Sequence, residues 1–69
     1  MSRRVETWFV TTPVSVELEQ LEDKRWAAIA PTNPHPNRHE RFVRIVSTNP
    51  TTAARIALEQ AGWVNPRYA

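Results

Sequence analysis

The chain contains no cysteine, only one glycine and no apolar run long enough to cross a membrane. Without cysteine, disulfide bonds and thiolate metal sites are excluded, and a reducing compartment is allowed. A single glycine, Gly62, excludes a glycine-rich loop that would hold phosphates. The N-terminal residues lack the apolar core of a signal peptide, so the sequence predicts a cytoplasmic protein.

A large excess of charge of one sign is also missing. Nine Lys and Arg residues against seven Asp and Glu residues give a formal net charge of +2. Such a small excess is weak support for nucleic-acid binding. At 69 residues the chain lies near the lower limit for folding without disulfides or metals, so we expect one small domain over residues 1–69.

The clearest pattern that is present predicts an amphipathic helix over residues 50–61. Asn49 is a suitable N-cap, and Pro50 is well tolerated at the first helical position. Gly62 can adopt the left-handed conformation that ends many helices. Apolar residues, most of them alanine, recur at helical spacing on one arc, so we expect that arc to pack closely on a sheet.

Four segments have the alternation and composition of β-strands: residues 4–11, 14–21, 25–30 and 40–47. For residues 14–21 a helix is the alternative, because Val14, Leu18 and Leu21 also match helical spacing. The strand is the better interpretation, since the period of two fits more of the residues.

The length of the turn before residue 25 decides on which face Trp26 lies. With a two-residue loop at Asp23 and Lys24, Trp26 lies on the face opposite Leu18, whereas a three-residue loop places both on one face. The turn has neither Asn-Gly nor Asp-Gly, so both alternatives stay open.

The remaining segments are expected to be connections. Residues 31–38 hold three prolines and predict a stiff surface loop, with a ligand for an aromatic groove as the alternative. Residues 63–69 predict a tail with two aromatic side chains. The expected fold is α+β, with a small antiparallel sheet of three to four strands and one C-terminal helix packed on one face.

One helix covers one face of a sheet, and the other face of a small antiparallel sheet is normally polar. We expect Trp8 and Val10 on the side away from the helix. The fourth strand adds one of two apolar pairs to that side: Phe42 with Val46, or Val43 with Ile45. An exposed apolar patch on the order of several hundred Å2 usually marks an interface.

Three kinds of cover are considered for this patch: the tail residues Trp63, Val64 and Tyr68, a second copy in a two-fold dimer, or a different protein. Trp, Tyr and Arg are the residue types enriched at binding hot spots. The candidate protein-binding residues are Trp8, Val10, Trp26, Phe42, Arg41, Arg44, Trp63 and Tyr68. Replacing Trp8 or Trp26 by alanine is then expected to weaken the contact without unfolding the chain, whereas unfolding would assign these residues to the core.

No pattern predicts catalysis. His35 and His39 are four positions apart, but the prolines around His35 argue against a shared helix face, and no third metal ligand is evident. No serine lies in a nucleophile motif, and the paired carboxylates are typical of a solvated strand and a turn. The sequence therefore predicts a protein that is not an enzyme and binds no metal or cofactor.

Nucleic-acid binding is the alternative function. Its candidate residues are Arg3, Arg4, Lys24, Arg25, Arg38, Arg41 and Arg44. Trp8 or Trp26 would supply stacking on bases.

The order of strand and Ala-rich helix in RFVRIVS and AARIAL resembles the second half of a double-stranded-RNA-binding domain, over roughly a third of the chain. In that family consecutive lysines at the start of the helix contact phosphates. Residues 49–52 are Asn, Pro, Thr and Thr here, so the resemblance implies no RNA contact.

The sequence thus favours a small non-enzymatic binding protein that contacts another protein or its own copy, with no membrane partner. Domains of this size without an active site are often modulators or inhibitors, including accessory proteins of phages and mobile elements.

Overall fold

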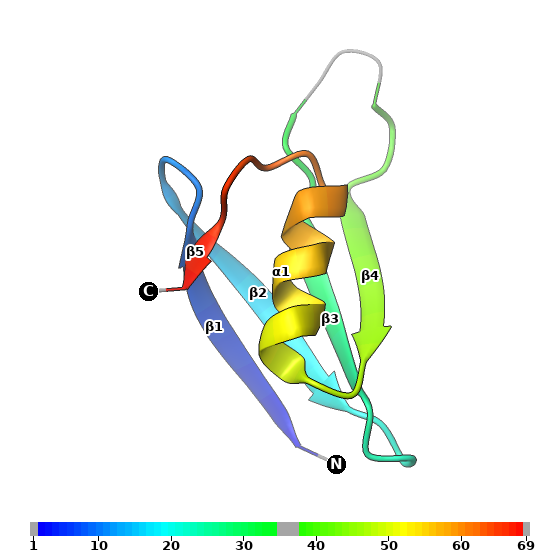
Figure 1. Cartoon of the computed structure of the whole chain (residues 1–69). Coiled ribbons are helices and arrows are strands. Elements are labelled where there is room, and N and C mark those ends of the chain that lie inside the picture. The colour runs from blue at the N-terminus through cyan, green and yellow to red at the C-terminus, as the bar shows by residue number, and fades with distance from the viewer. Residues whose placement is uncertain (1, 35–37, 69) are drawn as a thin grey trace.

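The computed structural model describes residues 2–34 and 38–68. In these two stretches the chain forms five strands and one helix: β1 (Arg3–Phe9), β2 (Pro13–Gln20), β3 (Trp26–Pro31), β4 (Phe42–Ser47), α1 (Pro50–Gln60) and β5 (Arg67–Tyr68). The strands form one antiparallel sheet in the order β4-β3-β2-β1-β5, and α1 packs on one side of it (Figure 1). The predicted α+β class is confirmed, and the sheet has one strand more than expected because β5 pairs with β1.

The segment with two interpretations, β2, is a strand. Val14, Val16 and Leu18 are buried, whereas the intervening Ser15 and Glu17 are exposed. This alternation is the period of two that favoured a strand over a helix.

The start of α1 follows the predicted signals. The Thr52 backbone N–H donates to the Asn49 side chain Oδ1 at 3.1 Å, and Pro50 occupies the first turn. This cap satisfies one of the helix's free N–H groups and stabilises it by about 1 kcal/mol.

The end of α1 is a Schellman motif around Gly62. Gly62 has φ 96°, its N–H donates to the Glu59 carbonyl at 3.1 Å, and the Trp63 N–H donates to the Leu58 carbonyl at 3.1 Å. Glycine adopts this positive φ without the steric cost of a Cβ, so it ends the helix as predicted.

The loop before β4 satisfies further carbonyls at the same helix end. The Asn33 N–H donates to the Ala61 carbonyl at 2.8 Å, and Arg38 Nη2 donates to the Gln60 carbonyl at 2.7 Å. A Cβ at Gly62 would lie 3.3 Å from Arg38 Nη1, so a side chain there would displace the guanidinium by a few tenths of an ångström. A cation beside a helix C-terminus is favourable because the last carbonyls carry partial negative charge.

The turn between β2 and β3 is the three-residue alternative. The Leu21 N–H donates to the Arg25 carbonyl at 2.7 Å, and Lys24 takes a left-handed φ of 70°. A three-residue hairpin loop commonly contains one residue in this conformation. The resulting register places Trp26 on the same face as Leu18.

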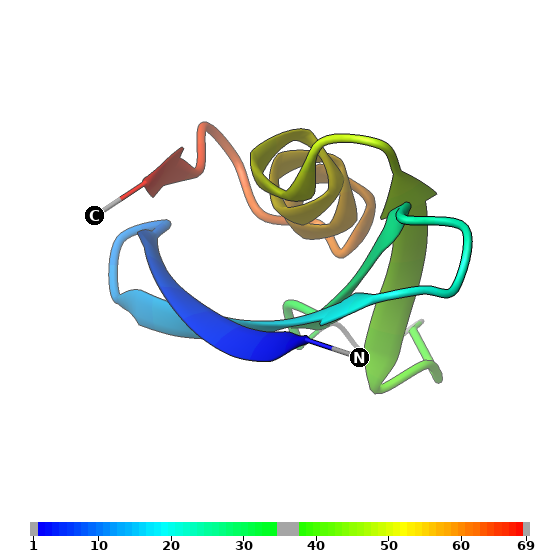
Figure 2. The ribbon, with the colours of Figure 1, turned by 90° about the horizontal axis from the view of Figure 1, so that it is seen from below.

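The sheet curls around α1, which lies on its concave side (Figure 2). The helix packs mainly on β3 and β4, and only slightly on β2. The core lies between these layers and contains Trp8, Val10, Val14, Val16, Leu18, Ala28, Ala30, Ala53, Ala54, Ala57, Leu58 and Ala61. Alanines line the buried side of α1, so the helix sits close to the sheet as predicted.

The prediction that Trp8 and Val10 lie away from the helix is wrong. They are only 2% and 5% exposed, and both belong to the core. The curl of the sheet brings β1 round to the helix side, and β5 then covers it. The Tyr68 ring meets the Trp8 ring edge to face, with centroids 5.4 Å apart.

The two alternatives for β4 are resolved by the core. Val43 and Ile45 pack against it, whereas Phe42 and Val46 lie on the opposite side of the sheet. The tail covers the concave side of the sheet and not the convex side, because Tyr68 contacts Trp8 and Trp63 packs against the core. Trp63 Nε1 also donates to the Pro31 carbonyl at 2.9 Å.

Candidate functional site

The convex side of the sheet, turned away from α1, is named here the outer face. Its members follow from the strand register and alternate with the core residues along each strand. They are Arg3, Val5, Thr7, Phe9, Pro13, Ser15, Glu17, Glu19, Ala27, Ile29, Pro31, Phe42, Arg44, Val46 and Arg67.

Large apolar side chains of the outer face are open to solvent. Val5 is 64% exposed, Phe9 47% and Phe42 63%. Ile29 and Val46 are half-buried between their cross-strand neighbours. These residues come from three different strands, so the apolar surface runs across the sheet instead of lying at one end.

Charged side chains are interleaved with this apolar surface. Glu17 lies between Val5 and Ile29 in the cross-strand row, and Arg44 lies next to Ile29 on the other side. Arg3 pairs with Glu19, with 3.5 Å between Nε and Oε2. The outer face is therefore a mixed surface, with acidic groups on its central strand and arginines on strands at either side.

A hollow of about 250 Å3 lies between β1 and β2, lined by Arg3, Arg4, Val5, Glu17 and Leu18. It is smaller than the roughly 300–1,000 Å3 of most small-molecule sites. Its ionisable lining consists of arginine and glutamate, without a histidine or a hydroxyl nucleophile among the five.

The two tryptophans predicted to contact a ligand, Trp8 and Trp26, do not lie on the outer face. Trp26 is half-buried on the helix side, and the Arg4 guanidinium carbon lies 5.0 Å from its ring centroid. This cation–π contact covers the ring that was expected to stack on bases or fill an interface. With Trp8 in the core, neither ring lies on the outer face.

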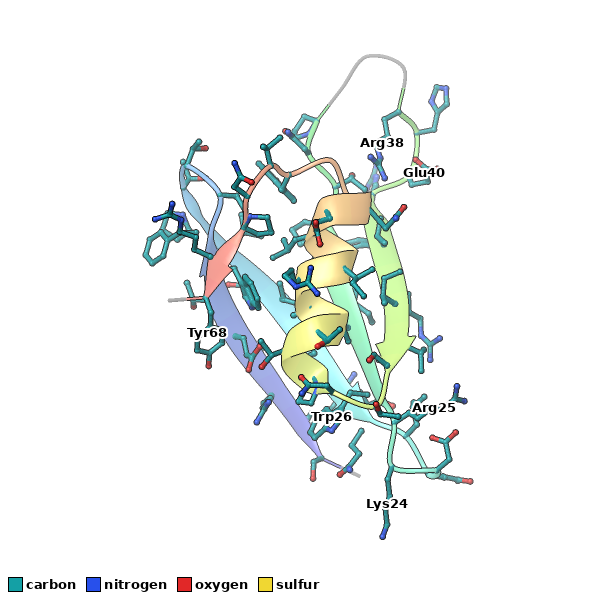
Figure 3. All side chains as sticks on the ribbon, viewed as in Figure 1. Lys24, Arg25, Trp26, Arg38, Glu40 and Tyr68 are labelled. Atoms are coloured by element: carbon teal, nitrogen blue, oxygen red, sulfur yellow. The ribbon has the colours of Figure 1, made fainter. Side chains whose placement is uncertain are left out.

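The predicted basic residues do not form one patch. Lys24 and Arg25 lie at the β2–β3 turn, and Arg38 lies at the end of α1 (Figure 3). Arg4 is turned to the concave side, where it contacts Trp26. Arg38 is also within 3.4 Å of Glu40 Oε2, which leaves its guanidinium engaged on two sides.

Arg41 and Arg44 differ from these. Both are exposed, and within the described residues no carboxylate lies at ion-pair distance from either guanidinium. Of the eight predicted protein-binding residues, Phe42 and Arg44 lie on the outer face, and Arg41 immediately precedes the same strand.

Val5, Phe9 and Ile29 were missed as candidates, and Val46 was named only in one of the two alternatives for the fourth strand. Alternation along β1 groups Val5 with Phe9 against Trp8, but both sets are apolar enough to face a core. Glu6 would have argued for the wrong assignment, because a carboxylate is normally expected on the solvent side. It is instead buried beside Trp8.

In the β2–β3 turn, the carboxyl group of Asp23 has a lowered pKa. The Arg25 backbone N–H donates to Asp23 Oδ1 at 3.1 Å, and Arg25 Nε donates to Oδ2 at 2.6 Å. These bonds, the backbone one foremost, hold the pKa of Asp23 below its ordinary value of 3.8.

The predicted histidine pair falls partly outside the described residues, because His35 is not among them, and His39 is exposed. Within residues 2–34 and 38–68 no three His, Asp or Glu side chains are grouped as metal ligands. The same stretches contain no helix of the length and apolarity that crossing a membrane requires.

Comparison of the chain with protein-family models, curated proteins and solved structures finds no match. The geometry of the outer face therefore carries the functional argument.

Proposed function

We propose that this is a small non-enzymatic binding protein that contacts a partner protein through its outer face and modulates or inhibits that partner. The observation that supports the proposal is the exposure of Val5, Phe9 and Phe42 on the side of the sheet opposite the helix. A cysteine-free chain suits a reducing compartment, and the cytoplasm is the proposed location.

The size of the outer face fits a protein contact. The described chain has a surface of 4825 Å2. A standard interface removes about 800 Å2 from each partner, close to a sixth of that surface. One face of a five-stranded sheet in a molecule 36 by 25 Å across is large enough to supply it.

A different protein fits this face better than a second copy of the chain. The outer face is convex across the strands (Figure 2), and two convex surfaces meet over a small area. A partner with a complementary concave or extended surface contacts more of it. The charges interleaved with the apolar side chains of this face give such a contact register and specificity.

Nucleic acid is the less favoured ligand of the same face. Glu17 and Glu19 occupy the central strand, where they would repel phosphates. Neither Trp8 nor Trp26 lies there to stack on bases. Arg3 and Arg44 remain on this face, but the two glutamates and the absence of both tryptophans from it make a protein the favoured ligand.

The proposal is tested by capture followed by a binding measurement with the purified partner. The double variant Val5→Lys with Phe42→Lys places two charges on the outer face and is expected to weaken binding by about tenfold or more. Val5→Lys alone is compared with Val64→Lys as the control of equal charge change, because Val64 is 75% exposed but lies outside the sheet.

Circular dichroism and urea unfolding are used to check that each variant keeps the fold. Equal binding by the double variant and the wild type would contradict the proposal. So would a dimeric mass of the protein alone by light scattering that the double variant reduces to a monomer. Binding to DNA or RNA that falls steeply with salt would favour the alternative function.

A further inference from the structure

The edge of the sheet at β4 is open. The Thr32 N–H donates to the Arg41 carbonyl at 3.0 Å, which makes this pair a hydrogen-bonded one in the β3–β4 ladder. Because such pairs alternate in an antiparallel ladder, Val43, Ile45 and Ser47 also direct their backbone groups at β3.

The backbone N–H and C=O groups of Phe42, Arg44 and Val46 then point away from the sheet. The cross-strand partners of these residues are Pro31, Ile29 and Ala27, at the non-hydrogen-bonded positions. In the described part of the chain no element lies beyond β4 (Figure 1), and β4 is the end member of the sheet. Six unpaired backbone groups in a row can bind an added strand.

The opposite edge offers less room. On β1 the residues that point outward alternate in the same way, but β5 already pairs with Trp8 and Phe9. A long strand added beside β1 would meet Tyr68. The edge at β4 has no such neighbour among the described residues.

Charge at the β4 edge selects the partner. Arg41 and Arg44 are both exposed and have no carboxylate at ion-pair distance among the described residues. An added strand would carry one side chain directly opposite Arg44, where a carboxylate is favourable and a cation is not.

A second copy is a poorer occupant for the same reason. Two-fold pairing of β4 with its own copy that joins all three outward residues sets Phe42 against Val46 and Arg44 against Arg44. Like charges directly opposite each other destabilise a strand pair.

We propose that the β4 edge binds an extended acidic segment of a partner protein, which adds to the sheet as an antiparallel sixth strand. Its side chains would alternate between the two sides of the sheet, with a carboxylate opposite Arg44 and apolar side chains opposite Phe42 and Val46. The proposal rests on the proposed function, and it specifies the chemistry of the partner.

The probe for the experiment is a blocked heptapeptide, Thr-Val-Thr-Glu-Thr-Val-Glu. With its central Glu opposite Arg44, its two Val side chains meet Phe42 and Val46, and its last Glu meets Arg41. The control peptide has Lys at both Glu positions. Amide hydrogen exchange is measured by NMR on isotope-labelled protein with each peptide.

The expected result is a period-two pattern of protection. The amides of Phe42, Arg44 and Val46 gain protection with the Glu peptide, whereas Val43 and Ile45, already bonded to β3, change little. The Glu peptide should bind about fivefold more tightly than the Lys peptide, since two pair energies are reversed.

Variants separate the charge from the backbone. Arg44→Glu should invert the preference between the two peptides, and Arg67→Glu, with the same charge change at the far edge, should not. Arg44→Pro removes the central outward N–H without removing a bond to β3 and should abolish protection at Phe42 and Val46.

Several results would overturn the inference. They are an absence of protection at the three amides with either peptide, equal affinity for both peptides, protection in the protein alone together with a dimeric mass, and protection by single-stranded DNA only. These readouts do not involve Val5 or Phe9, so a partner that binds the outer face while the β4 amides stay unprotected would leave the proposed function intact.

Discussion

Glu6 keeps its carboxylate on the concave side of the sheet because two neighbours on the same strand satisfy it. Arg4 Nη2 lies 3.3 Å from one oxygen, and Trp8 Nε1 donates to the other at 3.4 Å. Arg4 in turn covers the Trp26 ring. These four side chains form a polar margin to the core where the helix does not reach.

Trp8→Ala is expected to lower the free energy of unfolding by about 3–5 kcal/mol, because it removes a fully buried indole from the core. It also leaves Glu6 without its buried donor and Tyr68 without its edge-to-face partner. Urea unfolding followed by circular dichroism measures the change. A loss below about 1 kcal/mol would show that the ring contributes little to the core.

Individual side chains explain why the two faces of β1 could not be assigned from the sequence. Val5 and Phe9 compete with Trp8 and Val10 for the core, and each set is apolar. The contact that decides between them comes from Tyr68, at the other end of the chain. No local pattern carries that information.

Elements with a local signal were predicted well. The cap at Asn49, the stop at Gly62 and the alternation of β2 each depend on residues that are close together in the sequence. β5 was missed because its two residues have no alternation to detect and pair only with distant β1. The β2–β3 turn stayed open because Lys24, not glycine, holds the left-handed position.

That turn is expected to loosen in acid. The pKa of Asp23 is lower in the folded chain than its ordinary 3.8, so its bonds to Arg25 stabilise the folded state at pH values above 3.8. This contribution is lost as the pH falls through the lowered folded-state pKa, where the carboxylate takes up a proton.

Amide exchange at Arg25, followed by NMR from pH 6 to about 2, measures this effect. Asp23→Asn cannot accept from Arg25 as a charged group, so its turn should show no such pH dependence. A wild-type turn that responds to acid in the same way as Asp23→Asn would contradict the assignment.

At the scale of the whole molecule, the sheet receives two covers on its concave side. Alpha helix α1 covers β3 and β4, and the segment from Trp63 to Tyr68 covers the β1 half. The expectation of a single cover led to the surplus of apolar surface predicted for the outer face. The actual outer face keeps a smaller apolar surface because Trp8 and Val10 face inward.

Ending the chain after Trp63 should remove the second cover. The expected loss is about 1–2 kcal/mol of unfolding free energy, since an aromatic pair and two strand positions disappear while α1 remains. Tryptophan emission should shift to longer wavelength as Trp8 meets water. Unchanged emission and stability would show that β5 does not protect Trp8.

The strand order also sets an order of assembly. Neighbours from β1 to β4 are consecutive in the sequence, and α1 follows β4 directly, so nearly every pairing closes a short loop. The pairing of Trp8 with Tyr68 joins residues sixty positions apart. Because distant pairings cost more chain entropy before they form, we expect the meander and helix to consolidate first and β5 to dock last.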